Sequence, residues 1–475
     1  MRLAIANLRP SLQTLLGQAL PPVVIGWVGL ATGVFFLAST VRHGLFQSGV
    51  YDLGWFDQAV YLIAQGQPPI VSAVGFPVLG DHAAWILYPL AGLYRIYPSV
   101  LWLFAVQAIA LGAGVLPLWG LSREVGLPEA QTKAVVGVYL LYPLLFNVNL
   151  FDFHPEVIAL PLFLGAVLAV RRQQLGWFCL CLLLISGCKA VLALTIAAMG
   201  LWLLWSAQQR RYGLMALGWG MAWFLFSSQW LVPHFSGEQA AALGRYAYLG
   251  NSVLEIAANL FLKPGLVLGR LFSLATLEYL VLLLAPVIWL LSPRRLGPLL
   301  SAVPALMLNI LSDSAAQRDL VHQYSIPVLP FLLLAVIASL QARETLLHRP
   351  RWIILWSLVG FVTLSKFGYF CSIYLQSLDT WSATRSAIAL VDTQEPVLTT
   401  HEIAPHLAHR SRIEFTNEHR PPQNLAVFKY VLLNLKHPGF LSSPEFAQGL
   451  ERQLSQDPRF RLAFSQDHVY LFEHR

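Results

Sequence analysis

Charged residues are scarce in this chain, and their scarcity excludes an ordinary soluble protein. Only 12% of the 475 residues are charged, whereas 56% are hydrophobic. A soluble globular domain carries about a quarter charged residues. The apolar residues gather in runs of about 15 to 23 residues, near the length that crosses the hydrocarbon core of a bilayer. The sequence therefore predicts a mainly α-helical, multi-pass protein of the cell membrane.

Cysteine is also scarce, and its placement argues against a disulfide framework. The four cysteines, Cys179, Cys181, Cys188 and Cys371, all fall within apolar runs, where simple packing is the ordinary role of a thiol. The chain lacks a Walker loop, a dinucleotide-binding glycine fingerprint and a nucleophile elbow. Its net charge of +7 comes from basic residues in short loops rather than from a basic stripe, so we expect no nucleic-acid partner.

About eleven apolar runs are counted as transmembrane helices. They cover residues 22–41, 99–121, 134–150, 156–170, 175–188, 190–206, 213–233, 271–291, 296–311, 323–340 and 352–373. A shorter apolar stretch, residues 84–97, is expected to form a re-entrant or interfacial helix. We therefore predict a transmembrane helical domain over residues 1–375, with outer loops at 42–83 and 234–270.

Basic residues in the short loops predict the orientation of these helices through the positive-inside rule. Arg2 and Arg9 precede the first run, which suits a cytoplasmic N-terminus. With that start, every double-basic cluster falls on the cytoplasmic side. The clusters include Arg171-Arg172, Arg210-Arg211 and Arg294-Arg295. Most acidic residues of the membrane part fall on the opposite side, beside aromatic residues and histidines at helix ends.

After the last apolar run the chain becomes charged, which predicts a small soluble domain over residues 376–475. Strand-like segments at 397–400, 412–415, 430–433, 460–464 and 469–472 alternate with helical ones at 402–409 and 444–455. This order predicts an α/β domain, and the parity of the spans places it on the extracytoplasmic face. His401, His406 and His409 match no zinc signature and are expected on a solvated surface.

Two aspartates of the first outer loop are the candidate catalytic residues. Asp52 is expected at the start of a short surface helix, where a carboxylate also caps free N–H groups. Asp57 lies five positions later, so on a helix the two carboxylates diverge by about 140°. One of the two is therefore expected to face a given site. Asp52 is preferred, with Asp57 next.

Two acidic and histidine-containing clusters follow. The pair Asp81-His82 would bind a metal or relay a proton, and a solvated turn explains it equally well. In the segment from Asp152 to Glu156, alternation along an extended chain would project Asp152, His154 and Glu156 to one side. Ionisable groups at a membrane boundary are costly without a purpose. The candidate ligands of a divalent metal, Mg or Mn, are Asp81, Asp152 and His154.

Cations on the outer side are candidates for holding a phosphate. Lys189 interrupts an apolar run, so it either snorkels to the interface or contacts a phosphate. The predicted substrate-binding residues are His82, Asp152, His154, Glu156, Lys189, Arg245, Arg318 and His322.

At these residues the chain resembles a family of predicted prokaryotic membrane proteins known as domain of unknown function 2079. The resemblance lies in residues 52–58, His82, the Asp-Phe-His-Pro-Glu segment 152–156 and residues 398–410, and it covers most of the chain. That family is grouped with GT-C glycosyltransferases, which take a sugar from a polyprenyl-phosphate carrier and place an acidic residue in the first outer loop as base or metal ligand. Family members often show Lys-Glu-Asp, whereas this chain has Lys189-Ala190-Val191.

Three functions are compatible with these features. The resemblance implies a glycosyltransferase that moves a sugar from a polyprenyl-phosphate donor to an acceptor on the extracytoplasmic face. Asp52 or Asp57 would deprotonate the acceptor, and Lys189 or an outer arginine would stabilise the departing phosphate. A transporter or lipid flippase would need polar residues at the bilayer midplane and repeated halves, neither of which is evident. A non-catalytic membrane scaffold is favoured by the two acids missing after Lys189. Membrane lipids and the polyprenyl-linked donor are the expected partners; no oligomeric state is predicted.

Overall fold

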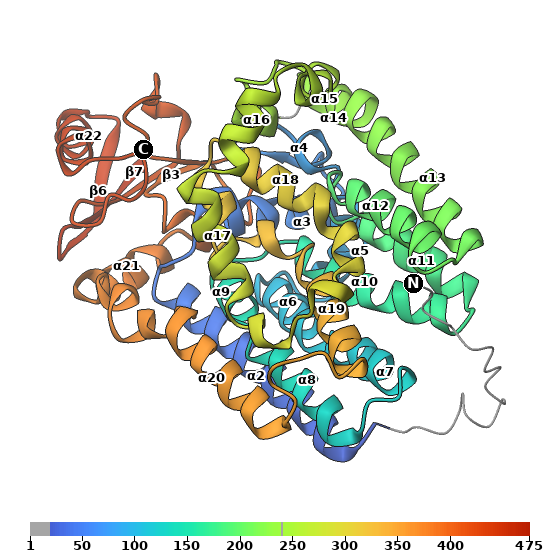
Figure 1. Cartoon of the computed structure of the whole chain (residues 1–475). Coiled ribbons are helices and arrows are strands. Elements are labelled where there is room, and N and C mark those ends of the chain that lie inside the picture. The colour runs from blue at the N-terminus through green and yellow to red at the C-terminus, as the bar shows by residue number, and fades with distance from the viewer. Residues whose placement is uncertain (1–19, 239–240) are drawn as a thin grey trace.

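The computed structural model describes residues 20–238 and 241–475, and over these residues the protein is mainly helical, as predicted. The segment that carries Arg2 and Arg9 lies outside the described residues. Figure 1 shows a large helical body with a small sheet at one side. The helices of the body are α2 (Pro22–Gly44), α3 (Trp55–Ala64), α4 (Leu79–His82), α5 (Leu87–Ile96), α6 (Leu101–Ala113), α7 (Val115–Glu124), α8 (Glu129–Leu140), α9 (Pro143–Leu150), α10 (Glu156–Arg171), α11 (Leu175–Ser186), α12 (Leu192–Trp205), α13 (Arg210–Phe226), α14 (Val232–Ser236), α15 (Val253–Leu262), α16 (Pro264–Leu271), α17 (Leu274–Leu284), α18 (Val303–Leu311), α19 (Leu329–Gln341) and α20 (Pro350–Leu364).

Several helices are suited to crossing a membrane. Among the described residues, three segments are long and apolar enough: Pro22–Gly44, Leu101–Glu124 and Glu129–Leu150. The number rises to five if each bent pair is one span, which adds Pro264–Leu271 with Leu274–Leu284 and Pro350–Leu364 with Phe367–Leu375. These helices agree with a membrane protein. The count of about eleven spans and the orientation stay predictions, because other apolar runs form shorter helices.

The sequence shows why some apolar runs are divided. Lys189 falls in the gap between α11, which ends at Ser186, and α12, which begins at Leu192. The run 134–150 divides into α8 and α9 at Pro143, which has no N–H to continue a helix. The short apolar stretch 84–97 forms α5, in agreement with the expectation of a short helix there.

The interior of the helical body is packed around helices that are apolar on every side. In α19, 11 of the 13 residues are buried, which is typical of a helix surrounded by other helices. Helices α12 and α13 approach closely because glycines face the contact. A Cβ atom at Gly200 would meet the backbone of Gly213 and Leu217, and one at Gly220 would meet the backbone of Ala197.

A small α/β unit, residues 378–474, follows the helical body and is coloured orange to red in Figure 1. Its sheet has the order β4-β3-β5-β7-β6, with β3 parallel to β4 and β5, and β7 antiparallel to β5 and β6. Helix α21 packs on one face and α22 on the other, so β5 is buried along its whole length. The predicted strands are confirmed. The elements are β3 (Val397–Thr399), β4 (Ile413–Phe415), β5 (Tyr430–Asn434), β6 (Phe460–Gln466), β7 (Val469–His474), α21 (Leu378–Ala389) and α22 (Pro444–Gln456).

The histidines of this unit contact the helical body, so the expectation of a solvated surface is wrong. The ring of His406 stacks on His43 of α2, with centroids 3.9 Å apart. His409 Nε2 lies 3.1 Å from Asp57 Oδ1, and His401 Nε2 accepts a hydrogen bond of 3.3 Å from the N–H of Val50. These contacts are long-range in sequence, which is why local pattern alone misplaced them. They seat the α/β unit on the first outer loop.

Candidate functional site

Asp52 lies in a π-helical turn, Val50–Gly54, that leads directly into α3. Turns of this kind are frequent at functional sites. The expected capping role of Asp52 is wrong, because no side-chain capping bond is made at either element. Its Oδ1 lies 3.2 Å from His154 Nε2 instead, and its side chain is 30% exposed. Asp52 therefore presents a held carboxylate that a ligand can still reach.

Gln107 of α6 holds the segment that carries Asp152 and His154. Its amide donates to the carbonyl oxygens of Asn149 and Asp152 at 3.3 and 3.0 Å, and its Oε1 accepts from the N–H of His154 at 3.1 Å. Asp152 adopts a left-handed backbone conformation, with φ of 75°. These hydrogen bonds fix the turn between α9 and α10 and place His154 in contact with Asp52.

The three ionisable residues of this segment have three separate partners. Asp152 pairs with Arg42 at the end of α2 and accepts a 2.9 Å hydrogen bond from the N–H of Gly49. His154 contacts Asp52, and Glu156 forms a 2.6 Å ion pair with Lys189. The predicted candidates therefore lie in adjoining pairs. Asp152 connects α2 to the outer loop, whereas His154 reaches the exposed carboxylate.

The surroundings keep Asp52 ionised. Burial opposes its charge, but the hydrogen bond from His154 and the nearby charges of Arg42 and His322 outweigh burial and place the pKa of Asp52 below its usual value. The ring of Phe151 lies between His154, at 5.4 Å, and His322, at 4.2 Å. A carboxylate is thus available near neutral pH, as a base requires.

A second group of charges gathers around Tyr324. Lys189 Nζ lies 5.7 Å from the centre of the Tyr324 ring. The guanidinium of Arg245 lies 5.3 Å from the same ring and donates to the Tyr324 hydroxyl at 3.0 Å. The carbonyl of His82 accepts from the N–H of Ala190 at 2.9 Å, so the loop after α4 adjoins the turn before α12.

The pair Asp81-His82 belongs to this second group. Burial disfavours the Asp81 carboxylate, but the charges of His82, Lys189 and Arg245 outweigh burial and place its pKa below the usual value. The charges of Lys189 and Arg245 therefore both act at the Asp81 carboxylate. Such an arrangement is suited to holding a phosphate.

Two of the predicted site residues, Arg318 and Asp57, have structural partners instead of facing a ligand. The guanidinium of Arg318 contacts the carbonyl of Ser312 beyond the end of α18, a typical place for a helix-capping cation. Asp57 has a side chain that is only 2% exposed. It accepts a 2.5 Å hydrogen bond from the Tyr94 hydroxyl and contacts His409. Asp57 is thus placed to hold the α/β unit on the outer loop.

The predicted metal ligands do not converge. Asp81 contacts His82, Asp152 contacts Arg42, and His154 contacts Asp52. Within residues 20–238 and 241–475, there is no group of three or more His, Cys, Asp or Glu side chains that could hold a metal ion. The charge of Arg42 would also repel a cation from Asp152. The described residues do not fit the expected Mg or Mn ion.

Several residues at the site were missed from the sequence, and some carried a signal. Arg42 is a cation at the end of the first apolar run that is predicted to face outward, where the positive-inside rule places few. Gln107 is a polar residue inside an apolar run, a common sign of an interhelical hydrogen bond. Tyr94 and His409 carried no local signal, because their partner Asp57 is distant in sequence.

The fold resembles that of a solved membrane protein. The crystal structure of ArnT from Cupriavidus metallidurans bound to undecaprenyl phosphate aligns with a TM-score of 0.54 and 12% identity, covering 96% of this chain and 98% of that chain. The apo structure of ArnT from the same organism gives a TM-score of 0.45 and 12% identity, covering 95% and 98%. At this identity the likeness concerns the fold, and it rests on the first structure.

The family comparison covers most of the sequence. The family model described as predicted membrane protein, DUF2079, matches residues 42–471, which include both charge groups and all but the last three residues of the α/β unit. No curated protein matches the chain. The chain therefore belongs to the DUF2079 family of predicted membrane proteins.

Proposed function

We propose that this protein is a membrane glycosyltransferase that moves a sugar from a polyprenyl-phosphate donor to an acceptor hydroxyl on the extracytoplasmic face. The observation that carries the proposal is the 30% exposed carboxylate of Asp52, which His154 contacts in the first outer loop. The cations around Tyr324 support it, as does the fold, which is shared with an ArnT structure that holds undecaprenyl phosphate. The orientation follows the positive-inside pattern.

In the proposed reaction Asp52 accepts the proton of the acceptor hydroxyl. The hydroxyl oxygen attacks the anomeric carbon of the donor sugar from the side opposite the phosphate. The bond between that carbon and the phosphate oxygen breaks, so the anomeric centre inverts and polyprenyl phosphate leaves with its electron pair. His154, 3.2 Å from Asp52, orients the carboxylate. No step requires a metal ion.

The departing phosphate gains negative charge, and nearby cations would stabilise it. Arg245 is the best placed residue, because its guanidinium contacts Tyr324 and has no carboxylate partner among the described residues. Lys189 is already paired with Glu156, so we propose that its charge contributes to the positive electrostatic potential around the phosphate but that it does not bind the phosphate alone. The two acids missing after Lys189 are not needed in this scheme.

The test is a transfer assay in lipid nanodiscs with labelled polyprenyl-phosphate sugars and acceptor lipids. Asp52→Asn keeps the shape of the side chain and removes its basicity, so the rate should fall about 100-fold or more. The matched control is Asp467→Asn, in the exposed β6–β7 turn, which should transfer at the wild-type rate. If Asp52→Asn transfers sugar at the wild-type rate, Asp52 is not the catalytic base. If the wild-type protein transfers sugar from no donor, a transporter or a non-catalytic scaffold is favoured.

A further inference from the structure

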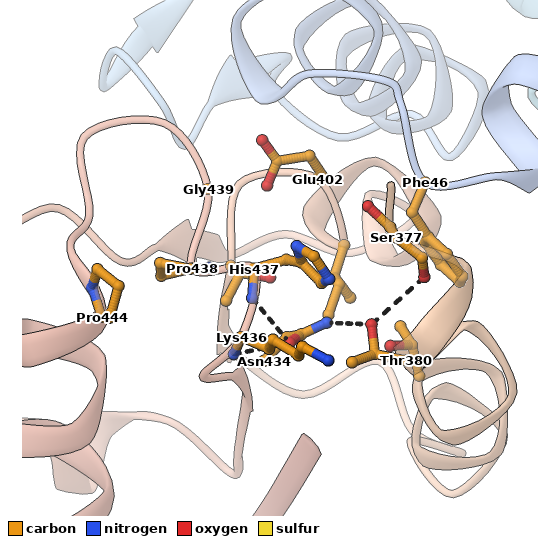
Figure 2. Close-up of a pocket in the computed structure, with 13 residues that line it drawn as sticks. Phe46, Ser377, Thr380, Glu402, Asn434, Lys436, His437, Pro438, Gly439 and Pro444 are labelled. Atoms are coloured by element: carbon orange, nitrogen blue, oxygen red, sulfur yellow. Dashed lines mark hydrogen bonds between the residues drawn. The ribbon is translucent and has the colours of Figure 1, made fainter. Parts of the chain in front are cut away.

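A cavity opens where the parallel strands of the α/β unit end. Its volume is about 360 Å³, and it is the pocket drawn in Figure 2. Thr400 directly follows β3 and Asn434 ends β5, so one wall is formed by the carboxyl ends of these strands. Ligands of α/β folds commonly bind at this edge of the sheet. The opposite wall comes from α21, through Thr380, and from Phe46 of the outer loop.

The lining offers hydrogen-bonding groups that are held in place. Asn434 donates to the Thr380 hydroxyl at 2.9 Å, and its Oδ1 accepts from the N–H groups of Lys436 and His437 at 3.2 and 3.1 Å, as the dashed lines of Figure 2 show. Thr400 Oγ1 and Glu402 Oε2 are buried and have no hydrogen-bond partner among the described residues. Buried polar atoms ordinarily have partners, so a ligand in the cavity would supply the hydrogen bonds that these two oxygens lack.

The one carboxylate of the lining, Glu402, makes no ion pair with a lysine or arginine of the described residues, and Lys436 is paired with Asp379, which lies outside the lining. Lys436 Nζ lies 2.5 Å from Asp379, and His437 Nε2 lies 2.8 Å from the same carboxylate. The hydrogen bond from Lys436 lowers the pKa of Asp379 to about 2, so this pair is satisfied. Among the described residues, the ionic partner of Glu402 is His401, whose Nδ1 lies 3.4 Å from Glu402 Oε1. An anionic ligand would be repelled here, whereas hydroxyl or amino groups would be bound.

The cavity adjoins the loop of the proposed catalytic residue. His401, beside Glu402, binds the N–H of Val50, which is two residues before Asp52. Phe46 lines the cavity, and its ring lies 4.5 Å from that of His406. The cavity therefore lies beside the segment 46–52 that leads to the proposed base, and the turn after β3 contacts both.

We propose that this cavity binds an uncharged or positively charged sugar residue of the acceptor. Glu402 and Thr400 would take hydrogen bonds with its hydroxyl or amino groups, and Phe46 would offer an apolar face. A volume of about 360 Å³ is at the lower end of small-ligand sites, which suits about one sugar residue. The donor phosphate is assigned elsewhere, to the cations around Tyr324. The inference rests on the proposed function and adds the chemical class of the acceptor.

The test measures binding without any donor. The full-length protein in nanodiscs is titrated with methyl glycosides of four kinds: a neutral hexoside, an N-acetylhexosaminide, an aminohexoside and a uronide. We expect a neutral or amino glycoside to bind and the uronide to bind at least about tenfold more weakly. Glu402→Gln should weaken binding about tenfold, since it removes a hydrogen bond to a charged group. Thr384→Trp, in the α21 wall, should abolish binding by filling the cavity.

The controls separate this inference from the proposed function. Glu395→Gln removes an exposed carboxylate of the same unit outside the cavity and should bind as wild type. Binding that withstands both Glu402→Gln and Thr384→Trp, or the absence of binding by every glycoside, overturns the inference. If the cavity variants lose binding but Asp52→Asn still transfers sugar, the catalytic proposal fails while the cavity assignment stands.

Discussion

Asp52 and Asp57 lie five positions apart, and their replacement should affect different properties of the protein. Asp57 is 2% exposed and holds both the Tyr94 hydroxyl and His409, so Asp57→Ala leaves the buried Tyr94 hydroxyl and the partly buried His409 ring without this partner. Breaking a buried, hydrogen-bonded charge pair costs about 3 to 5 kcal/mol. Asp52→Ala removes one partly exposed contact, with His154, and should cost about 1 kcal/mol.

The assay is hydrogen exchange of the backbone amides in residues 400–410, which form the turn that seats the α/β unit on the outer loop. Asp57→Ala should lower their opening free energy by several kcal/mol, whereas Asp52→Ala should leave it nearly unchanged and stop transfer. A double-mutant cycle with His409→Ala isolates the pair and should give a coupling of about 1 to 3 kcal/mol. Unchanged exchange in Asp57→Ala, or a coupling near zero, would refute the docking role of Asp57.

Three further predictions concern single residues. Burial lowers the pKa of His409, but the charge and hydrogen bond of Asp57 outweigh burial and raise it above the usual value. The stabilisation that this pair gives to docking is therefore complete below about pH 6.5 and is lost as the pH rises through the raised pKa. Hydrogen exchange of residues 400–410, measured between about pH 5 and 9, should show this fall in the opening free energy for the wild type. The fall should be absent in His409→Gln. Arg42→Ala leaves the carboxylate of Asp152 buried and should cost about 3 to 5 kcal/mol in thermal unfolding, which Arg42→Ala with Asp152→Asn should partly restore. Arg245→Ala should lower kcat/KM for the donor about 10- to 100-fold while leaving the melting temperature unchanged, and a wild-type kcat/KM would exclude its contact with phosphate.

Much of the fold was predictable, because hydropathy and alternation are local properties. The apolar runs located the helical body, and the charge of Lys189 marked the break between α11 and α12. The strand pattern of the α/β unit was predicted within one or two residues for the strands β3 to β7. Hydropathy did not settle the number of membrane spans. An apolar run shows the composition of a segment, but it does not show whether the helix that forms there is long enough to cross the membrane.

The candidate site was predicted in part. Residue type and position at helix ends singled out Asp52, His154, Lys189 and Arg245. The same reasoning placed Arg318 with the other cations, although its guanidinium contacts the carbonyl beyond α18. A cation that caps a helix and a cation that binds a ligand both occur near helix ends, so the sequence does not distinguish them.

The sequence by itself determined the class of the protein, its family and the list of candidate residues. Tertiary structure alone decided how the two aspartates differ. Asp52 meets His154 across 102 positions of the chain and stays partly exposed, whereas Asp57 meets His409 across 352 positions and is enclosed. Burial and partnership depend on which distant segments fold together, and these long-range contacts leave no periodic pattern in the sequence.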